Sequence, residues 1–185
     1  MNLELTNGSI LVRPYREEDT EALYEAARES IAEVSPWLPW CHPEYSRDET
    51  IAFIRSREEG WKSKTDYSFG IWDTGVSTYL GGVGLNQINS IHQIANLGYW
   101  IRSSAAGQGI ATIGARLVAR FGFEHLGFQR IEIITAVANK SSQRVAEKVG
   151  AIREGFQRKR LLIHGHSQDA LVFSLVAEDI EKWPN

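Results

Sequence analysis

Apolar side chains recur at helical spacing in the first third of the chain. After Asp19, which can cap a helix, they line one face through about Ser30, and this stripe predicts the first helix. The stripe consists of Leu23, Ala26, Ala27 and Ile31. A second helix is expected after Ser46, because Ser46 and Glu49 have the spacing of a capping box. Between the two helices, residues 35–43 contain three prolines and therefore cannot form regular structure.

Alternation of apolar with small or polar residues predicts strands in the middle of the chain. Residues 9–13 form a first predicted strand, which Pro14 ends. Residues 67–71, 79–85 and 96–102 form three more, separated by turn residues. Strands that follow one another this closely favour an antiparallel meander.

Beyond residue 107, helical and strand patterns alternate. The predicted elements are a helix over 108–123, a strand over 131–137, a helix over 141–149, and strands near 152–163 and 167–176. This order indicates a mixed α/β (α+β type) fold in which helices cover both faces of one sheet. The length of 185 residues suits a single domain that spans residues 1–185.

Composition and charge narrow the function classes. The 20 Lys and Arg residues against 23 Asp and Glu give a net charge of −3, whereas a nucleic-acid binder needs a strong basic excess. No uncharged apolar stretch approaches the ~20 residues of a membrane span, and no signal peptide is visible, so neither nucleic acid nor membrane is an expected partner. The single cysteine, Cys41, cannot form an internal disulfide, which fits a reducing cytoplasm.

The turn before the helix at 108–123 carries the most chemical information. Gly107 and Gly109 remove side chains there, and the first amides of a helix have no intrahelical partner. The amides of residues 107–112 could therefore bind a pyrophosphate without any lysine. A glycine-containing turn without a ligand is the alternative. No Gly-Lys-Ser/Thr follows the loop, which excludes a P-loop nucleotidase.

A second motif follows the strand over 131–137. Asn139 and the serines after it suit the N-terminus of a helix, and Gly150 suits its C-terminus. Taken in order, the two motifs resemble the GNAT superfamily of acetyl-CoA-dependent N-acetyltransferases, and within it the RimJ/RimL group, which acetylates N-terminal residues of ribosomal proteins. The resemblance covers nearly the whole chain and rests on Leu97-Gly98-Tyr99-Trp100-Ile101, Gly107-Gln108-Gly109-Ile110, Asn139-x-x-Ser142-x-x-Val145-Ala146-x-x-x-Gly150, Leu11-Val12-Arg13-Pro14 and Trp37-Leu38-Pro39-Trp40.

This resemblance implies a fold and a co-substrate. The GNAT fold has a twisted, mostly antiparallel sheet with helices on both faces, in which two parallel strands, here 96–102 and 131–137, splay apart. Acetyl-CoA would lie in this gap, and no metal is implied. The residues assigned to acetyl-CoA by the resemblance are Tyr99, Trp100, Ile101, Arg102, Gly107, Gln108, Gly109, Ile110, Ala111, Thr112, Asn139 and Ser142.

The resemblance also implies catalytic roles. Ser142 stands where the family often has a hydroxyl near the thioester sulfur, which would make it a general acid; a local backbone hydrogen bond is the alternative. Asn96 and Leu161 stand where related proteins have glutamates, so the general base is open, and Glu154, Asp66 or His164 could still reach the site. An N-terminal amine, with a pKa of about 7.7–8.0, needs less help than a lysine near 10.4, and Asn96 could serve as a modest proton acceptor.

Aromatic residues complete the expected site. Trp37, Trp40 and Tyr67 are assigned to the acceptor, with ordinary burial as the alternative. The expected activity is direct acetyl transfer, in a ternary complex, to the N-terminal α-amine of a protein, in particular a ribosomal one. A polyamine or aminoglycoside acceptor is a second option, and a non-catalytic acyl-CoA-binding module is a third. The resemblance also allows a homodimer, since relatives often form one.

Overall fold

The computed structural model describes residues 3–183. Its elements follow the predicted order and add short ones at β1, α2 and α6. In chain order they are β1 (Leu5–Thr6), β2 (Ile10–Pro14), η1 (Glu17–Asp19), α1 (Thr20–Glu29), α2 (Ile31–Val34), α3 (Arg47–Ser63), β3 (Tyr67–Asp73), β4 (Tyr79–Asn89), β5 (Ile94–Ile101), η2 (Ser103–Ala105), α4 (Ile110–Glu124), β6 (Arg130–Ala136), α5 (Lys140–Val149), β7 (Ile152–Ile163), β8 (His166–Leu175) and α6 (Ala177–Ile180).

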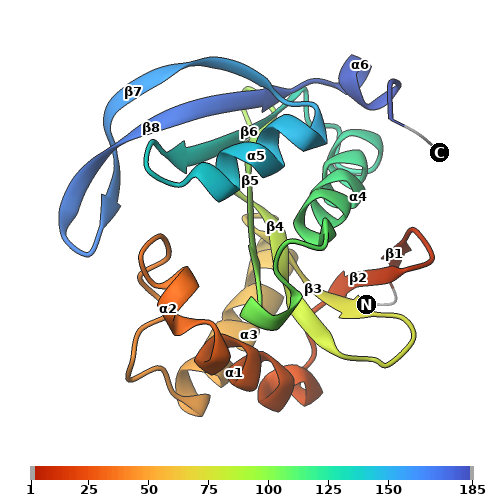
Figure 1. Ribbon diagram of the computed structural model, residues 1–185. Helices are drawn as coiled ribbons and strands as arrows, with labels where there is room; N and C mark the ends of the chain where they lie inside the picture. Colours follow the sequence, from red (N-terminus) through yellow and green to blue (C-terminus); the bar gives the residue numbers. More distant parts are fainter. Residues whose placement is uncertain (1–2, 184–185) are drawn as a thin grey trace.

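The strands form one eight-stranded sheet in the order β1-β2-β3-β4-β5-β6-β8-β7. Neighbouring strands are antiparallel except β5 and β6, which are parallel. The long β7–β8 hairpin extends beyond the rest of the sheet (Figure 1). The predicted mixed sheet with one parallel pair is therefore confirmed.

Helices cover both faces of this sheet (Figure 1). On one face α4 lies so close that a Cβ on Gly114 would meet Ile71 and Val83 of the sheet. On the other face a second cluster packs Tyr79 of β4 beneath α1 and α3, through side chains that include Leu23 and Ile54. We call these the α4 face and the α1 face.

The parallel pair is short. Paired positions join Ile94–Asn96 of β5 to Arg130–Glu132 of β6, and residues 97–101 and 133–136 have no partner across this pair. We call these unpaired halves of β5 and β6 the splay. The strands separate here as the resemblance implied, and each half of the splay is held by its other neighbour, β4 or β8.

Two predicted helix starts have different outcomes. The capping box of α3 is confirmed, since the Ser46 side chain accepts from the amide of Glu49 and the Glu49 side chain accepts from the amide of Ser46. Asp19 stands at the N-cap of α1 as predicted, but its side chain makes no capping hydrogen bond there. Its carboxylate instead binds the buried Arg13 guanidinium, at 2.7 and 2.8 Å, because a buried charge requires a partner.

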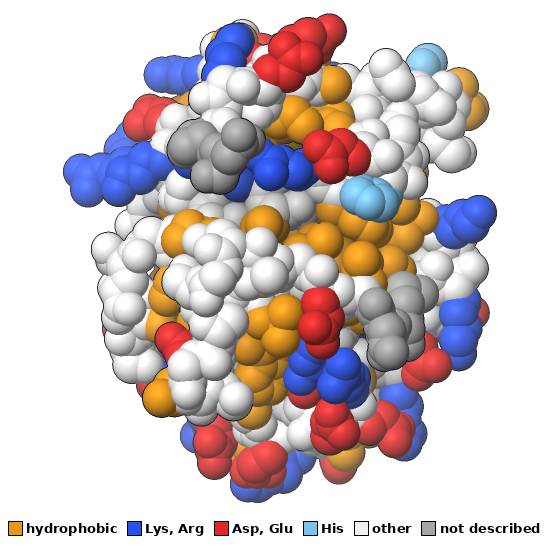
Figure 2. Space-filling model, turned by 90° about the vertical axis from the view of Figure 1, so that its right-hand side faces the viewer, with side chains coloured by type: hydrophobic (Ala, Val, Ile, Leu, Met, Phe, Trp, Pro, Cys, Tyr) orange, Lys and Arg blue, Asp and Glu red, His pale blue; other side chains and the backbone are white. Residues whose placement is uncertain are grey.

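Charges of both signs share the surface. On the face shown in Figure 2, Lys and Arg side chains lie among Asp and Glu side chains, with hydrophobic side chains exposed between them. Within residues 3–183, no helix is long and apolar enough to cross a membrane. The same residues contain no group of three or more His, Cys, Asp or Glu side chains that could hold a metal ion.

Candidate functional site

The glycine turn has the geometry of an anion site. Gly107 and Gly109 have φ angles of +78° and +81°, in the left-handed region that favours glycine. A Cβ added at either position would meet no atom within 4 Å, so the space outside the turn is open. Gly109 is the N-cap of α4 and offers no capping side chain. The loop therefore exposes backbone where other helices place a Ser or Asp side chain.

The amides of this turn are free. In the part of the chain that the structure describes, none of the amides of residues 107–112 donates a hydrogen bond to a backbone or side-chain acceptor. Flanking amides are occupied, since Ala106 donates to Ser103 and Ile113 donates to Gly109. Six consecutive free donors at the positive end of a 15-residue helix fit a diphosphate.

An acidic side chain of α1 anchors the residues before this turn. Glu29 accepts hydrogen bonds from the guanidinium of Arg102 and, at 2.7 Å, from the amide of Ser104. The Arg102 bonds lower the pKa of Glu29 to about 2. Arg102 also donates to the carbonyl of Tyr79 at 3.1 Å. The Arg102 side chain thus holds the turn in place. Because this side chain is already bonded to Glu29 and Tyr79, only the Arg102 backbone is left to contact a ligand.

The second motif meets β5 on the α4 face. Asn139 caps α5, because its Oδ1 accepts from the amide of Ser142 at 3.0 Å, and Gly150 ends the helix with φ +98°. The Tyr99 hydroxyl donates to the Ser142 carbonyl oxygen at 3.0 Å and lies 3.2 Å from Ser142 Oγ. Burial raises the pKa of Tyr99 to about 12, so this hydroxyl keeps its proton at neutral pH. Two hydroxyls therefore lie together beside the splay.

The α1 face of the splay has a different character. Asn96 donates to Asn86 Oδ1 at 2.9 Å across the β4–β5 pair. The next opposed pair on this face, toward the end of β5, consists of Gly84 and Gly98, and a Cβ on Gly98 would meet only Asn86, at 3.5 Å. Trp100 follows, packed over Gly82. The face thus offers the side-chain amides of two asparagines at one end, uncovered backbone at Gly98 in the middle and the Trp100 indole at the other end.

The aromatic residues assigned to the acceptor lie in two places. Trp40 packs edge-on against Trp100 with ring centroids 5.2 Å apart, and it is 37% exposed. Trp37 is half-buried in the same proline-containing segment. Tyr67 lies elsewhere, because its ring packs against Trp61 and Phe121 in the core under α4. The structure brings Trp40 to the α1 face of the splay and does not bring Tyr67 there.

A polar cluster adjoins Asn96, and it contains Glu132, which the sequence analysis missed. Glu132 is opposite Asn96 in the β5–β6 pair, and its Oε1 accepts from Arg130 Nε at 2.9 Å. Arg130 also binds Glu154, which in turn accepts from Ser174. Hydrogen bonds from Arg130 lower the pKa of Glu154 to about 2. One signal was available in the sequence, since Glu132 is the one carboxylate in the predicted strand over 131–137.

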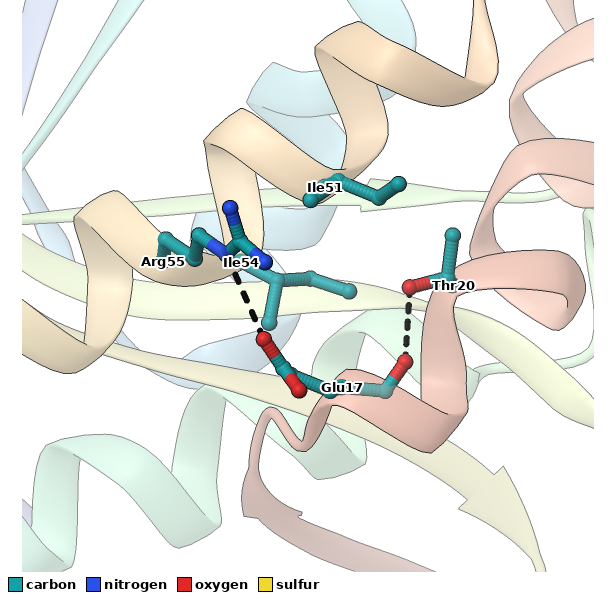
Figure 3. Close-up of a pocket in the computed structure, with 5 residues that line it drawn as sticks. All are labelled: Glu17, Thr20, Ile51, Ile54 and Arg55. Atoms are coloured by element: carbon teal, nitrogen blue, oxygen red, sulfur yellow. Dashed lines mark hydrogen bonds and ion pairs between the residues drawn. The ribbon is translucent and has the colours of Figure 1, made fainter.

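A surface hollow between η1, α1 and α3 lies apart from these residues. Glu17, Thr20, Ile51, Ile54 and Arg55 line it (Figure 3). Glu17 binds Arg55 at 3.2 Å, and its carbonyl accepts from the Thr20 hydroxyl at 2.6 Å. These polar groups satisfy one another, and none of the residues belongs to either motif.

Comparisons with known proteins agree with this geometry. The family model described as an acetyltransferase (GNAT) domain matches residues 9–152. The Bacillus subtilis protein named "Putative ribosomal N-acetyltransferase YdaF" is 28% identical over 95% of both chains. The solved structure of RimL, a ribosomal L7/L12 alpha-N-protein acetyltransferase in complex with coenzyme A, has a TM-score of 0.85 at 21% identity, covering 96% of this chain and 99% of that one. Mycobacterium smegmatis RimJ, in complex with a CoA disulfide, has a TM-score of 0.86 at 23% identity, covering 96% and 87%.

Proposed function

The chain belongs to the GNAT acetyltransferase family, and from this premise we propose that its acceptor is the α-amine of a protein N-terminus, with ribosomal proteins as the first class to test. The observation that carries the proposal is the two-sided splay. Its α4 face has free backbone amides and two hydroxyls. Its α1 face has an uncovered stretch of backbone between asparagine side chains and indole rings. Such a site can receive a nucleotide thioester from one side and a chain end from the other.

The α4 face provides the groups for acetyl-CoA, which supplies the activated acetyl group when bound. The free amides of residues 107–112 would hold the diphosphate. The unpaired backbone of residues 97–101 would orient the pantetheine arm and place an amide near the thioester carbonyl. Tyr99 and Ser142 lie where a proton can be supplied to the leaving sulfur. The RimL structure supports this assignment, since RimL has a similar fold and holds coenzyme A.

The missing family carboxylates favour an α-amine over a lysine. Position 96 is Asn, and position 161 is Leu, which is half-buried on β7. At neutral pH about a tenth of an α-amine is already neutral, whereas a lysine amine is almost wholly charged. The relative YdaF, 28% identical over most of both chains, points to the same acceptor class through its name. Acetyl-CoA and nascent protein N-termini meet in the cytoplasm, where we expect the enzyme to act.

Release of free CoA with defined amines tests this function. One peptide set has a free N-terminus and no lysine, a second set has a blocked N-terminus and one lysine, and spermidine represents small amines. Turnover with the first set alone is the expected result. Turnover with only lysine peptides or only spermidine would contradict the acceptor assignment.

A non-catalytic acyl-CoA-binding module is the second candidate, and the same two substitutions, Asn96 and Leu161, favour it. Calorimetry separates it from the enzyme. Binding of acetyl-CoA without CoA release, across all three amine sets, would support the module and overturn the transfer function.

A further inference from the structure

The proposed transfer requires a group that takes a proton from the acceptor ammonium, and positions 96 and 161 provide no carboxylate. We propose that Glu132 of β6 is this proton acceptor. The inference rests on the proposed function. It assigns the base to β6, whereas position 96 lies on β5 and position 161 lies on β7.

Glu132 occupies a singular place in the sheet. It is paired with Asn96 in the last opposed pair of β5 and β6 before the splay begins. Paired residues on neighbouring strands project from the same face, about 4.8 Å apart. Asn96 shares its face with Asn86, because their side chains are hydrogen-bonded. Glu132 therefore projects from the α1 face, where the acceptor would enter.

The distance to the reacting atoms suits transfer through one water. Gly98 lies two residues beyond Asn96, which is about 6.6 Å along the strand. A Cβ on Gly98 would meet no atom closer than Asn86 at 3.5 Å, so an amine can rest above it. The Glu132 side chain is 27% exposed, which lets water reach its carboxylate.

The surrounding charges favour an ammonium. Within residues 3–183, the charged groups bonded around Glu132 are Arg130 of its own strand and, through Arg130, Glu154 of β7. Ser174 of β8, Asn96 and Asn86 are neutral. Two carboxylates share one guanidinium, which leaves a net charge of −1 near the uncovered backbone at Gly98. This charge attracts a cationic acceptor.

The neighbouring amide provides a place for the proton. Asn96 Oδ1 is buried and, among the described residues, accepts no hydrogen bond. A buried acceptor without a donor is costly. Protonated Glu132 has an O–H on the same face of the same opposed pair, which is the kind of donor that this oxygen lacks.

The step balances as follows. The acceptor ammonium loses one proton through water to Glu132, its freed lone pair forms the C–N bond to the acetyl carbonyl carbon, and the nitrogen then loses a second proton to water. The C–S bond breaks, its electron pair leaves on sulfur, and the thiolate takes the proton of the Tyr99–Ser142 hydroxyl pair, which solvent restores. The products are the acetylated amine and CoA, and the proton on Glu132 returns to solvent.

A pH profile of the Glu132→Gln variant tests the assignment, using the most active peptide with a free N-terminus. Below the pKa of the amine, wild-type kcat/KM is expected to be flat, because the enzyme deprotonates the bound ammonium. In the variant kcat/KM is expected to fall about 100-fold near pH 7. The kcat/KM of the variant should then rise about tenfold per pH unit, following the neutral fraction of the amine.

Glu154→Gln is the matched control, since it removes the other carboxylate that binds Arg130. It removes one negative charge near the acceptor and should lower kcat/KM by less than about tenfold, while the flat profile is kept because Glu132 remains. Equal losses and parallel profiles in both variants would show that Glu132 is structural, and a flat wild-type-like profile in Glu132→Gln would show that it is not the base. Acetyl-CoA binding by calorimetry and the unfolding midpoint report on correct folding. A wild-type enzyme without turnover would instead overturn the proposed function itself.

Discussion

The hydroxyl of Tyr99 joins β5 to α5, lying 3.0 Å from the carbonyl oxygen of Ser142 and 3.2 Å from its Oγ. This contact fixes the first turn of α5 against the unpaired half of β5. Side chains of β5 and α5 thus meet at the point where the strands separate, and either hydroxyl can pass a proton to a leaving group.

Removal of either hydroxyl should slow the chemical step modestly. A thiolate, with an ordinary pKa of about 8.5, is a good leaving group and needs little protonation. We therefore expect Tyr99→Phe and Ser142→Ala each to lower kcat about tenfold with little change in the KM for acetyl-CoA. The double variant should lose much less than the product of the two single losses, because the hydroxyls act as one unit.

Ser141→Ala is the control for this cycle, since Ser141 precedes Ser142 on α5 and is exposed. It should match wild type in kcat. Fully additive losses in the double variant, or an equal loss in Ser141→Ala, would argue against a shared proton-donating role for Tyr99 and Ser142.

Gly109→Ala should weaken acetyl-CoA binding. At φ +81° an alanine is strained by about 1–2 kcal/mol, and its methyl group would project into the open space that the diphosphate is proposed to fill. We expect the Kd for acetyl-CoA to rise at least about tenfold in calorimetry.

Gly165→Ala separates strain from ligand contact. Gly165 has φ +76°, open space at its Cβ, and a position in the β7–β8 turn. It should lose similar stability in thermal unfolding while it keeps wild-type affinity. A Kd that rises equally in both variants would contradict a specific role for the loop.

The sequence predicted elements well because their signals are local. The stripe in residues 110–121 and the glycines around it predicted α4 within two residues at its start. The parallel pairing of β5 with β6 came from the family resemblance, because hydrophobic alternation does not specify which strands pair. Short elements such as β1 and α2 carried too few residues for a periodic signal.

Side-chain partners were harder to predict, because they depend on register and on faces. Tyr67 belongs to the α4 face, and alternation alone does not say which face of a strand meets the acceptor. Asp19 stands before a helix like a cap, yet a buried arginine six residues earlier takes its carboxylate. Glu132 became visible only when the register placed it opposite Asn96.

Trp40 is expected to contribute to acceptor binding. It is partly exposed, and its contact with Trp100 closes a small aromatic hollow that is also lined by Leu23, Tyr45 and Phe53. Trp40→Ala should raise the KM for the acceptor peptide about tenfold or more while the KM for acetyl-CoA stays within about twofold.

Phe156→Ala provides the comparison, because Phe156 is 53% exposed on β7 and carries no assigned role. Its acceptor KM should equal that of wild type. If Trp40→Ala changed only the unfolding midpoint, the indole would be a packing residue and the acceptor would bind elsewhere on the α1 face.

Acid should release the anchor between α1 and the residues just before the glycine turn. Bonds from Arg102 lower the pKa of Glu29 from 4.5 to about 2 in the folded protein. A carboxyl with a depressed folded-state pKa contributes stability that is fully present above about pH 4.5 and is lost as the pH falls toward 2. The urea midpoint of wild type should therefore exceed that of Glu29→Gln at pH 6, and the difference should shrink between pH 4.5 and 2.

Glu154, whose pKa is also lowered to about 2, is present in both proteins and cancels in the difference. Glu25→Gln, an exposed change on the same helix, should stay parallel to wild type throughout. A midpoint difference for Glu29→Gln that does not vary with pH would mean that Arg102 holds the loop without this ion pair.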